Sequence, residues 1–174
     1  IAAVQALGGI VVPIHPESTD NELKKILNDS KTEILIAEDQ QQVDTFLTVE
    51  ADCSIKKIIY LDGRGMSTYQ NENLGSYDDL VENSNNNSIE NDINSVNEND
   101  TAFYLFDEHE DALYKVSHGA IIKNSLKIIS LNTLTQKDSI VSYLPLSIPT
   151  NLLFTYVTSL SSGMSLNLPE SNQT

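Results

Sequence analysis

The feature that most constrains the fold is an alternation in the first half of the chain between short apolar runs and amphipathic stretches with helical spacing. Apolar runs at 33–37 and 57–61 are separated by a segment whose apolar residues fall on one helical face. Parallel strands need a long crossover of this kind, and a helix usually supplies it. The sequence therefore predicts an α/β fold built from βαβ units.

Residues 1–82 are interpreted as a βαβ-type subdomain. The stretch 10–14 is expected to form the first strand, and Pro13 favours a sheet edge or a strand end because it cannot donate to a ladder. Thr19 and Glu22 have capping-box spacing, which predicts a helix start. The elements expected after this point are a helix ending near 28–30 with Leu23, Ile26 and Leu27 inward, a strand at 33–37, a helix at 41–49 with Val43, Phe46 and Leu47 inward, and a strand at 57–61.

A change in composition separates this subdomain from the rest of the chain. Residues 83–99 contain eight asparagines and few apolar side chains. Such a segment buries too little apolar surface to offset its ordering entropy, so we predict a flexible linker. Residues 100–174 are interpreted as a second α/β segment of the same incomplete domain. Its expected elements are a strand at 101–106, a helix capped by Ser117 with Ile121, Ile122, Leu126 and Ile129 inward, a strand at 139–143, a helix at 151–160 and a strand at 165–168.

Several strings, taken in order, resemble one enzyme superfamily. They are Ala6 to Pro16 followed by Glu17, Ser18 and Thr19; Ile26 to Ser30; Ile58 to Met66; Ser76 to Leu80; Leu144 to Ser147 after Asp138; and the glycine at 163. Together they are similar to the adenylate-forming, AMP-binding superfamily, and within it to long-chain fatty acyl-CoA synthetases. The resemblance implies part of the layered parallel-sheet N-terminal domain of acyl-CoA synthetases.

The resemblance also implies a reaction and its cofactors. In that family ATP and a fatty acid give an acyl-adenylate, and coenzyme A then takes the acyl group, with Mg²⁺ assisting. We expect none of these cofactors for this chain itself. The adenine and ribose contacts, the magnesium-binding acid and the C-terminal domain are expected beyond residue 174. Because Ile1 already lies inside an apolar stretch, the chain is interpreted as a fragment.

The family's phosphate-binding loop is where the sequence departs most. In the family the strand matching 101–106 leads into a loop rich in Ser, Thr and Gly that ends in Pro-Lys-Gly and then Ser-His. Here the segment 104–115 has no glycine and carries four carboxylates, at Asp107, Glu108, Glu110 and Asp111. Each would repel a phosphate charge by about 1 kcal/mol at ~4 Å in water. The sequence therefore predicts that no triphosphate binds here.

We expect no catalytic residue and no metal site. Candidate vestigial nucleotide contacts, carried over from the resemblance, are Tyr104, Lys115, Ser117, His118 and Ser147. Ile148 stands where the family commonly has a histidine, and an aliphatic side chain cannot form a hydrogen bond. Residues 107–111 could chelate a divalent cation, but a solvated acidic loop is favoured because the run has no glycine turn.

Three further features were weighed against structural roles. His118 could act as a general base, yet a hydrogen bond at a helix terminus is favoured. His15 lies at a strand end, where a structural turn is favoured over a ligand contact. An acyl tunnel is the alternative to core packing, which helical spacing favours, for the apolar positions Leu152, Leu153, Phe154, Tyr156, Val157 and Leu160.

Charge and cysteine content exclude some classes of function. A net charge of −15 would repel nucleic acid and anionic membranes. Cys53, the single cysteine, fits a reducing compartment, so a cytoplasmic location is expected. No apolar run reaches the ~18 residues that a transmembrane helix needs.

Three functional interpretations remain at this point. The first is a catalytically inactive part of an acyl-CoA synthetase, a pseudoenzyme. The second is a non-enzymatic acidic module that binds a basic protein, and the third is an enzyme completed by another chain. Fatty acid, a protein partner and self-association are all compatible with the sequence, and exposed sheet edges would favour the last.

Overall fold

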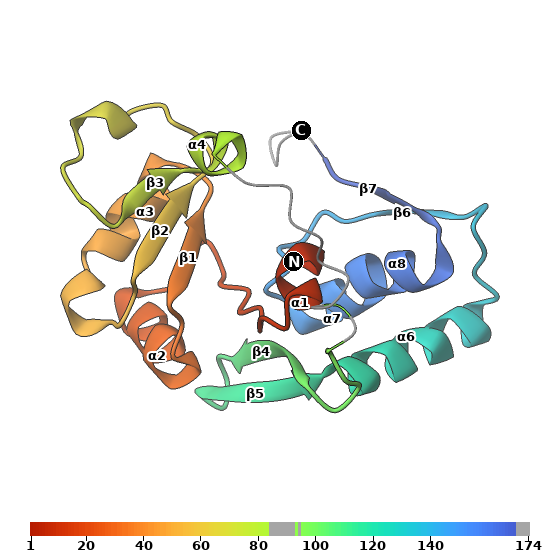
Figure 1. The fold of residues 1–174 in the computed structure, drawn as a ribbon. Coiled ribbons are helices and arrows are strands. Elements are labelled where there is room, and N and C mark those ends of the chain that lie inside the picture. Colours follow the sequence, from red (N-terminus) through yellow and green to blue (C-terminus); the bar gives the residue numbers. More distant parts are fainter. Residues whose placement is uncertain (84–92, 94, 170–174) are drawn as a thin grey trace. The chain divides into compact units, whose positions relative to one another are not determined.

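The computed structural model describes residues 1–83, 93 and 95–169, and it divides into two compact units (Figure 1). One unit is 16–88, and the other joins 1–15 to 89–174. Both mix helices and strands, and parallel pairing occurs in each, which confirms the α/β class. Within the described ranges, no helix combines the length and apolarity needed to cross a bilayer.

The unit 16–88 is a small parallel sheet with helices between its strands. Three strands pair in the order β1-β2-β3, all parallel, with Ile34 beside Lys57 and Ile58 beside Leu74. The elements are α2 (Asp20–Ser30), β1 (Ile34–Ala37), α3 (Gln40–Leu47), a 3₁₀ turn (Glu50–Asp52), β2 (Lys57–Tyr60), a second 3₁₀ turn (Met66–Thr68), β3 (Leu74–Ser76) and α4 (Tyr77–Glu82).

Helix α2 shows how local signals and packing cooperate in this unit. The Thr19 hydroxyl accepts from the Glu22 N–H at 3.4 Å, and the Glu22 carboxylate accepts from the Thr19 N–H at 2.8 Å, so the predicted capping box is confirmed. The predicted inward residues Leu23, Ile26 and Leu27 are all buried. They share the core of the unit with Ala37, Val43, Phe46, Val49, Ile58, Ile59 and Met66.

The second unit combines a β-hairpin, a long helix and a two-stranded parallel sheet. Its elements are α1 (Ala2–Ala6), β4 (Thr101–Asp107), β5 (Ala112–Ser117), α6 (His118–Asn132), β6 (Ser139–Val141), α7 (Pro149–Asn151), a π-helical stretch (Leu152–Val157), α8 (Thr158–Ser162) and β7 (Ser165–Asn167). Strands β4 and β5 pair antiparallel, and β6 and β7 pair parallel. The core is formed by Ala102, Phe103, Ile121, Leu152 and Val157.

The strand predicted at 10–14 is wrong in extent. Only Val11 forms a bridge, parallel to Phe103. Its N–H donates to the Ala102 carbonyl at 3.1 Å, and its carbonyl accepts from the Tyr104 N–H at 3.0 Å. Pro13 has no N–H, which stops the ladder from continuing. The Gln5 side chain donates to the Ala102 carbonyl at 3.0 Å and ties the first helix to the same strand.

The helix predicted from Ser117 is confirmed, but its inward face is partly wrong. Ile121 and Ser125 are the buried residues of α6. Ile122 and Leu126, which we expected to face inward, are 47% and 54% exposed. The apolar residues of α6 are spread over more than one face, and this unit covers only one of them.

Two other segments differ from the sequence prediction. The helix predicted at 151–160 begins earlier, at Pro149, and contains the π-helical stretch. Strand β3 and helix α4 were not predicted. Most of the linker predicted at 83–99 lies outside the described residues. Its last residues, 97–99, form a turn with Asp100, whose N–H donates to the Asn97 carbonyl at 3.0 Å.

Candidate functional site

The segment that resembles a phosphate-binding loop is a β-hairpin. Strand β4 pairs with β5 so that Tyr104 lies opposite Lys115 and Asp107 opposite Ala112. Residues 108–111 form the turn between them. Asp111 adopts a φ of 47°, a left-handed conformation that aspartate tolerates better than most residues. The segment 104–115, the counterpart of the family's phosphate-binding loop, therefore consists of parts of two paired strands and the turn that joins them.

The Asp107 carboxylate stabilises the turn of this hairpin through hydrogen bonds to its backbone. The Asp107 Oδ1 atom accepts from the His109 N–H at 2.9 Å and from the Glu110 N–H at 3.2 Å. The Tyr114 hydroxyl donates to the Glu110 carboxylate. In loops that bind anions, such successive N–H groups point at the anion. Here a carboxylate of the chain already accepts from them.

Helix α6 follows the hairpin directly. The first N–H groups of this helix also donate to acceptors of the chain itself. The Ser117 hydroxyl accepts from the Ala120 N–H at 3.2 Å, which confirms the predicted N-cap. The His118 N–H donates to the Asp100 carbonyl at 3.0 Å, and the Gly119 N–H donates to the Glu98 carbonyl at 2.7 Å.

Gly119 makes this arrangement possible. A Cβ atom at Gly119 would lie 3.0 Å from the Glu98 carbonyl oxygen, a close approach that a side chain would hinder. The first N–H donors of the helix, which would otherwise be free for an anion, are therefore occupied by the chain itself.

Four of the five candidate contacts lie on one continuous segment. Tyr104 and Lys115 are register partners, and the Lys115 ammonium lies 5.7 Å from the centre of the Tyr104 ring, within the range of a cation–π contact. Ser117 ends β5 and His118 begins α6. Ser147 lies in a separate segment, before α7. Its Oγ atom is buried and has no hydrogen-bond partner in the described part of the chain.

A buried polar cluster that the sequence analysis missed holds the segment containing Ser147. The Asn151 side-chain amide donates to the Leu144 carbonyl at 2.6 Å and to the Ser142 hydroxyl at 3.1 Å. Thr155, one helical turn later, donates to the Asn151 carbonyl at 2.6 Å. The signal in the sequence was a pair of polar residues at i and i+4 in an apolar helix, which predicts a satisfied internal network.

The other candidate positions are placed as follows. His109 and Glu110 are exposed in the hairpin turn, and among the residues that the structure describes no three His, Cys, Asp or Glu side chains are grouped as metal ligands. Of the apolar positions weighed for an acyl tunnel, Leu152 and Val157 lie in the core, whereas Phe154 and Leu160 are exposed.

Comparison with known proteins identifies the fold. The family described as "AMP-binding enzyme" matches residues 1–106. A protein of Rhodopseudomonas palustris assigned as a long-chain-fatty-acid CoA ligase superimposes with a TM-score of 0.77 at 17% identity, over 95% of this chain and 39% of that one. MatB from the same species, with ATP bound, gives a TM-score of 0.74 at 18% identity, over 96% of this chain and 31% of MatB.

A long-chain-fatty-acid-CoA ligase from Archaeoglobus fulgidus is a third solved structure with this fold. It gives a TM-score of 0.69 at 17% identity, over 95% of this chain and 31% of the ligase. The chain thus spans about a third of the length of the solved structures that it matches. No curated protein sequence matches the chain significantly.

Proposed function

Because the chain belongs to the AMP-binding enzyme family, we propose that it is a partial AMP-binding domain of the acyl-CoA ligase type that does not form an acyl-adenylate by itself. The observation that carries this proposal is that backbone N–H groups of the hairpin turn already donate to a carboxylate of the chain. The Asp107 carboxylate accepts from the His109 and Glu110 N–H groups, which are the donors that a phosphate would need.

The charge of the turn supports the same proposal. Glu108, Glu110 and Asp111 are exposed beside Asp107, so a triphosphate would approach four carboxylates. Each would repel a phosphate charge by about 1 kcal/mol at ~4 Å in water. The family implies ATP and Mg²⁺, but the residues present here do not fit the phosphates, and we assign no reaction step to them.

Nucleotide binding is tested by thermal unfolding of the chain with ATP·Mg²⁺, with AMP and with a long-chain fatty acid. A ligand that binds only the folded state raises the melting temperature. We expect no rise with either nucleotide and no pyrophosphate exchange. A saturable rise with ATP·Mg²⁺ would show that the hairpin still binds phosphate and would refute the proposal.

A matched variant separates two effects on phosphate binding: repulsion by the carboxylates, and the engagement of the backbone N–H groups by Asp107. Replacing Glu108, Glu110 and Asp111 by Gln, Gln and Asn removes the repulsion but leaves the hydrogen bonds of Asp107. We expect this variant to remain unresponsive to nucleotide. If it responds, charge alone excludes phosphate. Should any nucleotide shift occur, we propose that Tyr104, Lys115, Ser117, His118 and Ser147 carry the contact, and Lys115→Ala should reduce it.

A second candidate function is a non-enzymatic module that binds a basic protein. It is favoured by one observation, the display of Glu108, Glu110 and Asp111 on a turn whose backbone is fixed by hydrogen bonds. Binding of this kind should weaken steeply with salt. Equal binding by the charge-neutralised turn variant would exclude the turn as the contact.

Two further proposals concern partners and location. We propose that the chain self-associates, because within the described residues β6 and β7 form a two-stranded parallel sheet, and parallel sheets are normally covered on both faces. A fatty acid remains a proposed ligand by analogy with the family. The single cysteine, Cys53, supports a cytoplasmic location.

A further inference from the structure

We propose that the outer face of α6, which is basic and apolar, binds the acidic and apolar helix α4 of a second copy of this chain. This inference rests on the proposed self-association and names the surfaces that make it. Neither surface belongs to the hairpin, so the inference is independent of nucleotide binding.

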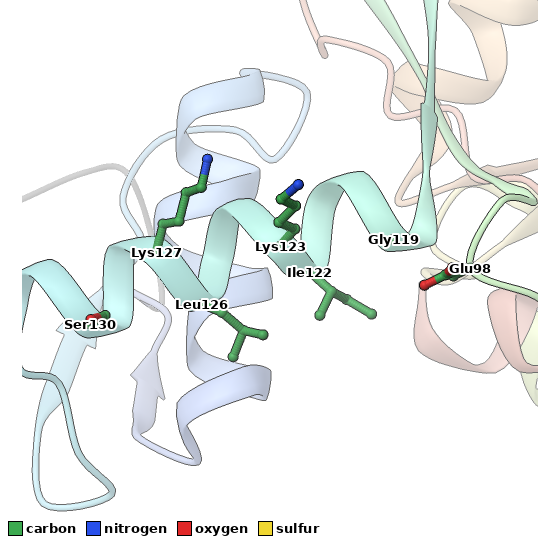
Figure 2. A pocket seen from close by; sticks show the side chains of 7 residues that line it. All are labelled: Glu98, Gly119, Ile122, Lys123, Leu126, Lys127 and Ser130. Atoms are coloured by element: carbon green, nitrogen blue, oxygen red, sulfur yellow. The ribbon is translucent and has the colours of Figure 1, made fainter.

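The outer face of α6 carries an apolar stripe and two lysines. A groove of about 520 Å³ runs along it, lined by two lysines and one acidic residue beside apolar and small side chains: Glu98, Gly119, Ile122, Lys123, Leu126, Lys127 and Ser130. Figure 2 shows Ile122 and Leu126 projecting from one side of the helix and the two lysines from another. Ile122 and Leu126 are 47% and 54% exposed.

The two lysines are free to pair with a partner. Across the described residues, neither Lys123 nor Lys127 has an ion-pair partner. Helix α6 contains no acidic residue, although the chain carries a net charge of −15. Because the face combines apolar contact area with fixed positive charge, it fits an amphipathic helix with acidic residues.

Helix α4 has the complementary chemistry. Its sequence from residue 77 to residue 82 is Tyr-Asp-Asp-Leu-Val-Glu, and none of the six residues is buried. Tyr77, Leu80 and Val81 are 45%, 48% and 49% exposed. A helix of six residues is too short to be stable by propensity alone, and packing of an apolar face normally stabilises such helices. Its exposed apolar face therefore calls for a contact.

The spacing of the charges matches between the two helices. Lys123 and Lys127 are four residues apart on α6, and Asp78 and Glu82 are four residues apart on α4. At about 100° per residue, the lysine pair lies about 100° around α6 from its apolar stripe. The acidic pair lies about 130° around α4 from its apolar face, in the same rotational direction.

Because the charged pair is displaced from the apolar face in the same rotational direction on both helices, only one relative orientation brings the two pairs together. With the apolar faces in contact, the lysine pair and the acidic pair lie on the same side of the interface only if the helices run antiparallel. Lys123 then lies opposite Glu82 and Lys127 opposite Asp78. Each copy carries one α4 and one α6, so each copy offers both surfaces of the proposed contact. The long-range repulsion between acidic copies is screened beyond ~8 Å at physiological ionic strength.

Charge reversal with rescue tests this interface. The full chain, the Lys123→Glu/Lys127→Glu variant and the Asp78→Lys/Glu82→Lys variant are compared by analytical ultracentrifugation over a concentration series. We expect the unchanged chain to dimerise and each variant to associate at least about tenfold more weakly. Mixing the two variants restores opposite charges at both contacts, so an equimolar mixture should dimerise again.

Controls keep the outcomes distinct. Lys31→Glu/Lys137→Glu changes the net charge equally but leaves α6 intact, and it should dimerise like the unchanged chain. Circular dichroism checks that each variant is folded. If the unchanged chain is monomeric, both this inference and the proposed self-association fail. If it dimerises and the α6 variant dimerises equally well, or if the mixture is not rescued, only the helix interface is refuted. The nucleotide titration is unaffected by any of these results.

Discussion

Helices α2 and α6 have similar apolar spacing but different burial. In α2, Leu23, Ile26 and Leu27 are 6%, 1% and 2% exposed. In α6, Ile122 and Leu126 were predicted to face inward by the same pattern, yet both are about half exposed. The apolar face of α2 is covered within its own unit, whereas α6 is apolar on two sides and only one is covered. Periodicity thus identifies an apolar stripe, but not whether a partner for it lies in the same chain.

The largest difference in stability should come from replacing one isoleucine by alanine in each helix. Ile26→Ala in α2 is expected to lower the free energy of unfolding by about 3 kcal/mol, because it leaves a cavity in a covered core. Ile122→Ala in α6 should change it by less than about 0.5 kcal/mol in the monomer, because the side chain is half solvated.

Hydrogen exchange resolved by peptide measures this difference for each helix separately. A dilute sample keeps the proposed dimer from contributing. Equal losses of protection in α2 and α6 would mean that the outer face of α6 is covered in the isolated chain and would remove the contrast between the helices.

Removal of the two N-caps should give an intermediate effect. Thr19→Ala removes the hydroxyl that accepts from the Glu22 N–H and donates to the Glu22 carboxylate, although the backbone N–H of residue 19 can still donate to that carboxylate. We expect it to destabilise α2 by about 1 kcal/mol. Ser117→Ala breaks one bond, and the Asp100 and Glu98 carbonyls still satisfy the neighbouring N–H groups. We expect a loss at the low end of the range, about 0.5 kcal/mol.

Amide hydrogen-exchange rates in the first turn of each helix measure how much stability each helix loses when its cap is removed. Thr19→Ser and Ser117→Thr serve as conservative controls because each keeps a capping hydroxyl. A larger loss at Ser117 than at Thr19 would show that the carbonyls of 98 and 100 do not hold the start of α6.

The smallest effect concerns the thiol beside α2. Burial, reinforced by Asp52, raises the pKa of Cys53 above its ordinary value, and Lys24 opposes the shift. Asp52 in turn pairs with Lys24 of α2 at 2.7 Å. Because the folded pKa is raised, the contribution to stability is complete below the unfolded pKa of ~8.5 and is lost as pH rises through the folded value.

Alkylation with iodoacetamide across a pH series measures this shift. The midpoint of the rate should lie above that of the unfolded chain in urea, and Asp52→Asn should move it down slightly. A midpoint at or below the unfolded value would show that the thiol is solvated and that the segment after α3 is not closed against α2.

Signals confined to a few neighbouring residues predicted structure well. The capping box at Thr19 and the cap at Ser117 were both predicted, because each depends on residues within one helical turn. The parallel pairing of β1 with β2 followed from the length of the crossover between them. The caps depend on a few neighbouring residues, and the strand pairing depends on two successive strands of one βαβ unit.

Two kinds of feature were missed: a pairing with a distant partner, and a hairpin whose turn has no glycine. The strand predicted at 10–14 is reduced to the Val11 bridge, and its partner Phe103, which lies far along the chain, was not predicted. The β4–β5 hairpin was missed because its turn has no glycine, and Asp111 adopts the left-handed conformation instead. The strand-favouring residues Tyr114 and Val116, after the acidic turn, were the available signal.

The start of α6 has a consequence for the evolutionary history of this chain. The N–H groups that could meet a phosphate are engaged in two separate places, by the Asp107 side chain in the turn and by backbone carbonyls of 98 and 100 at the helix. Replacing Asp107 would free only the first set, because no side-chain change removes a backbone carbonyl. If the proposed function is correct, a descendant would bind phosphate here only after a coordinated rearrangement of two segments, which point mutation and selection reach slowly.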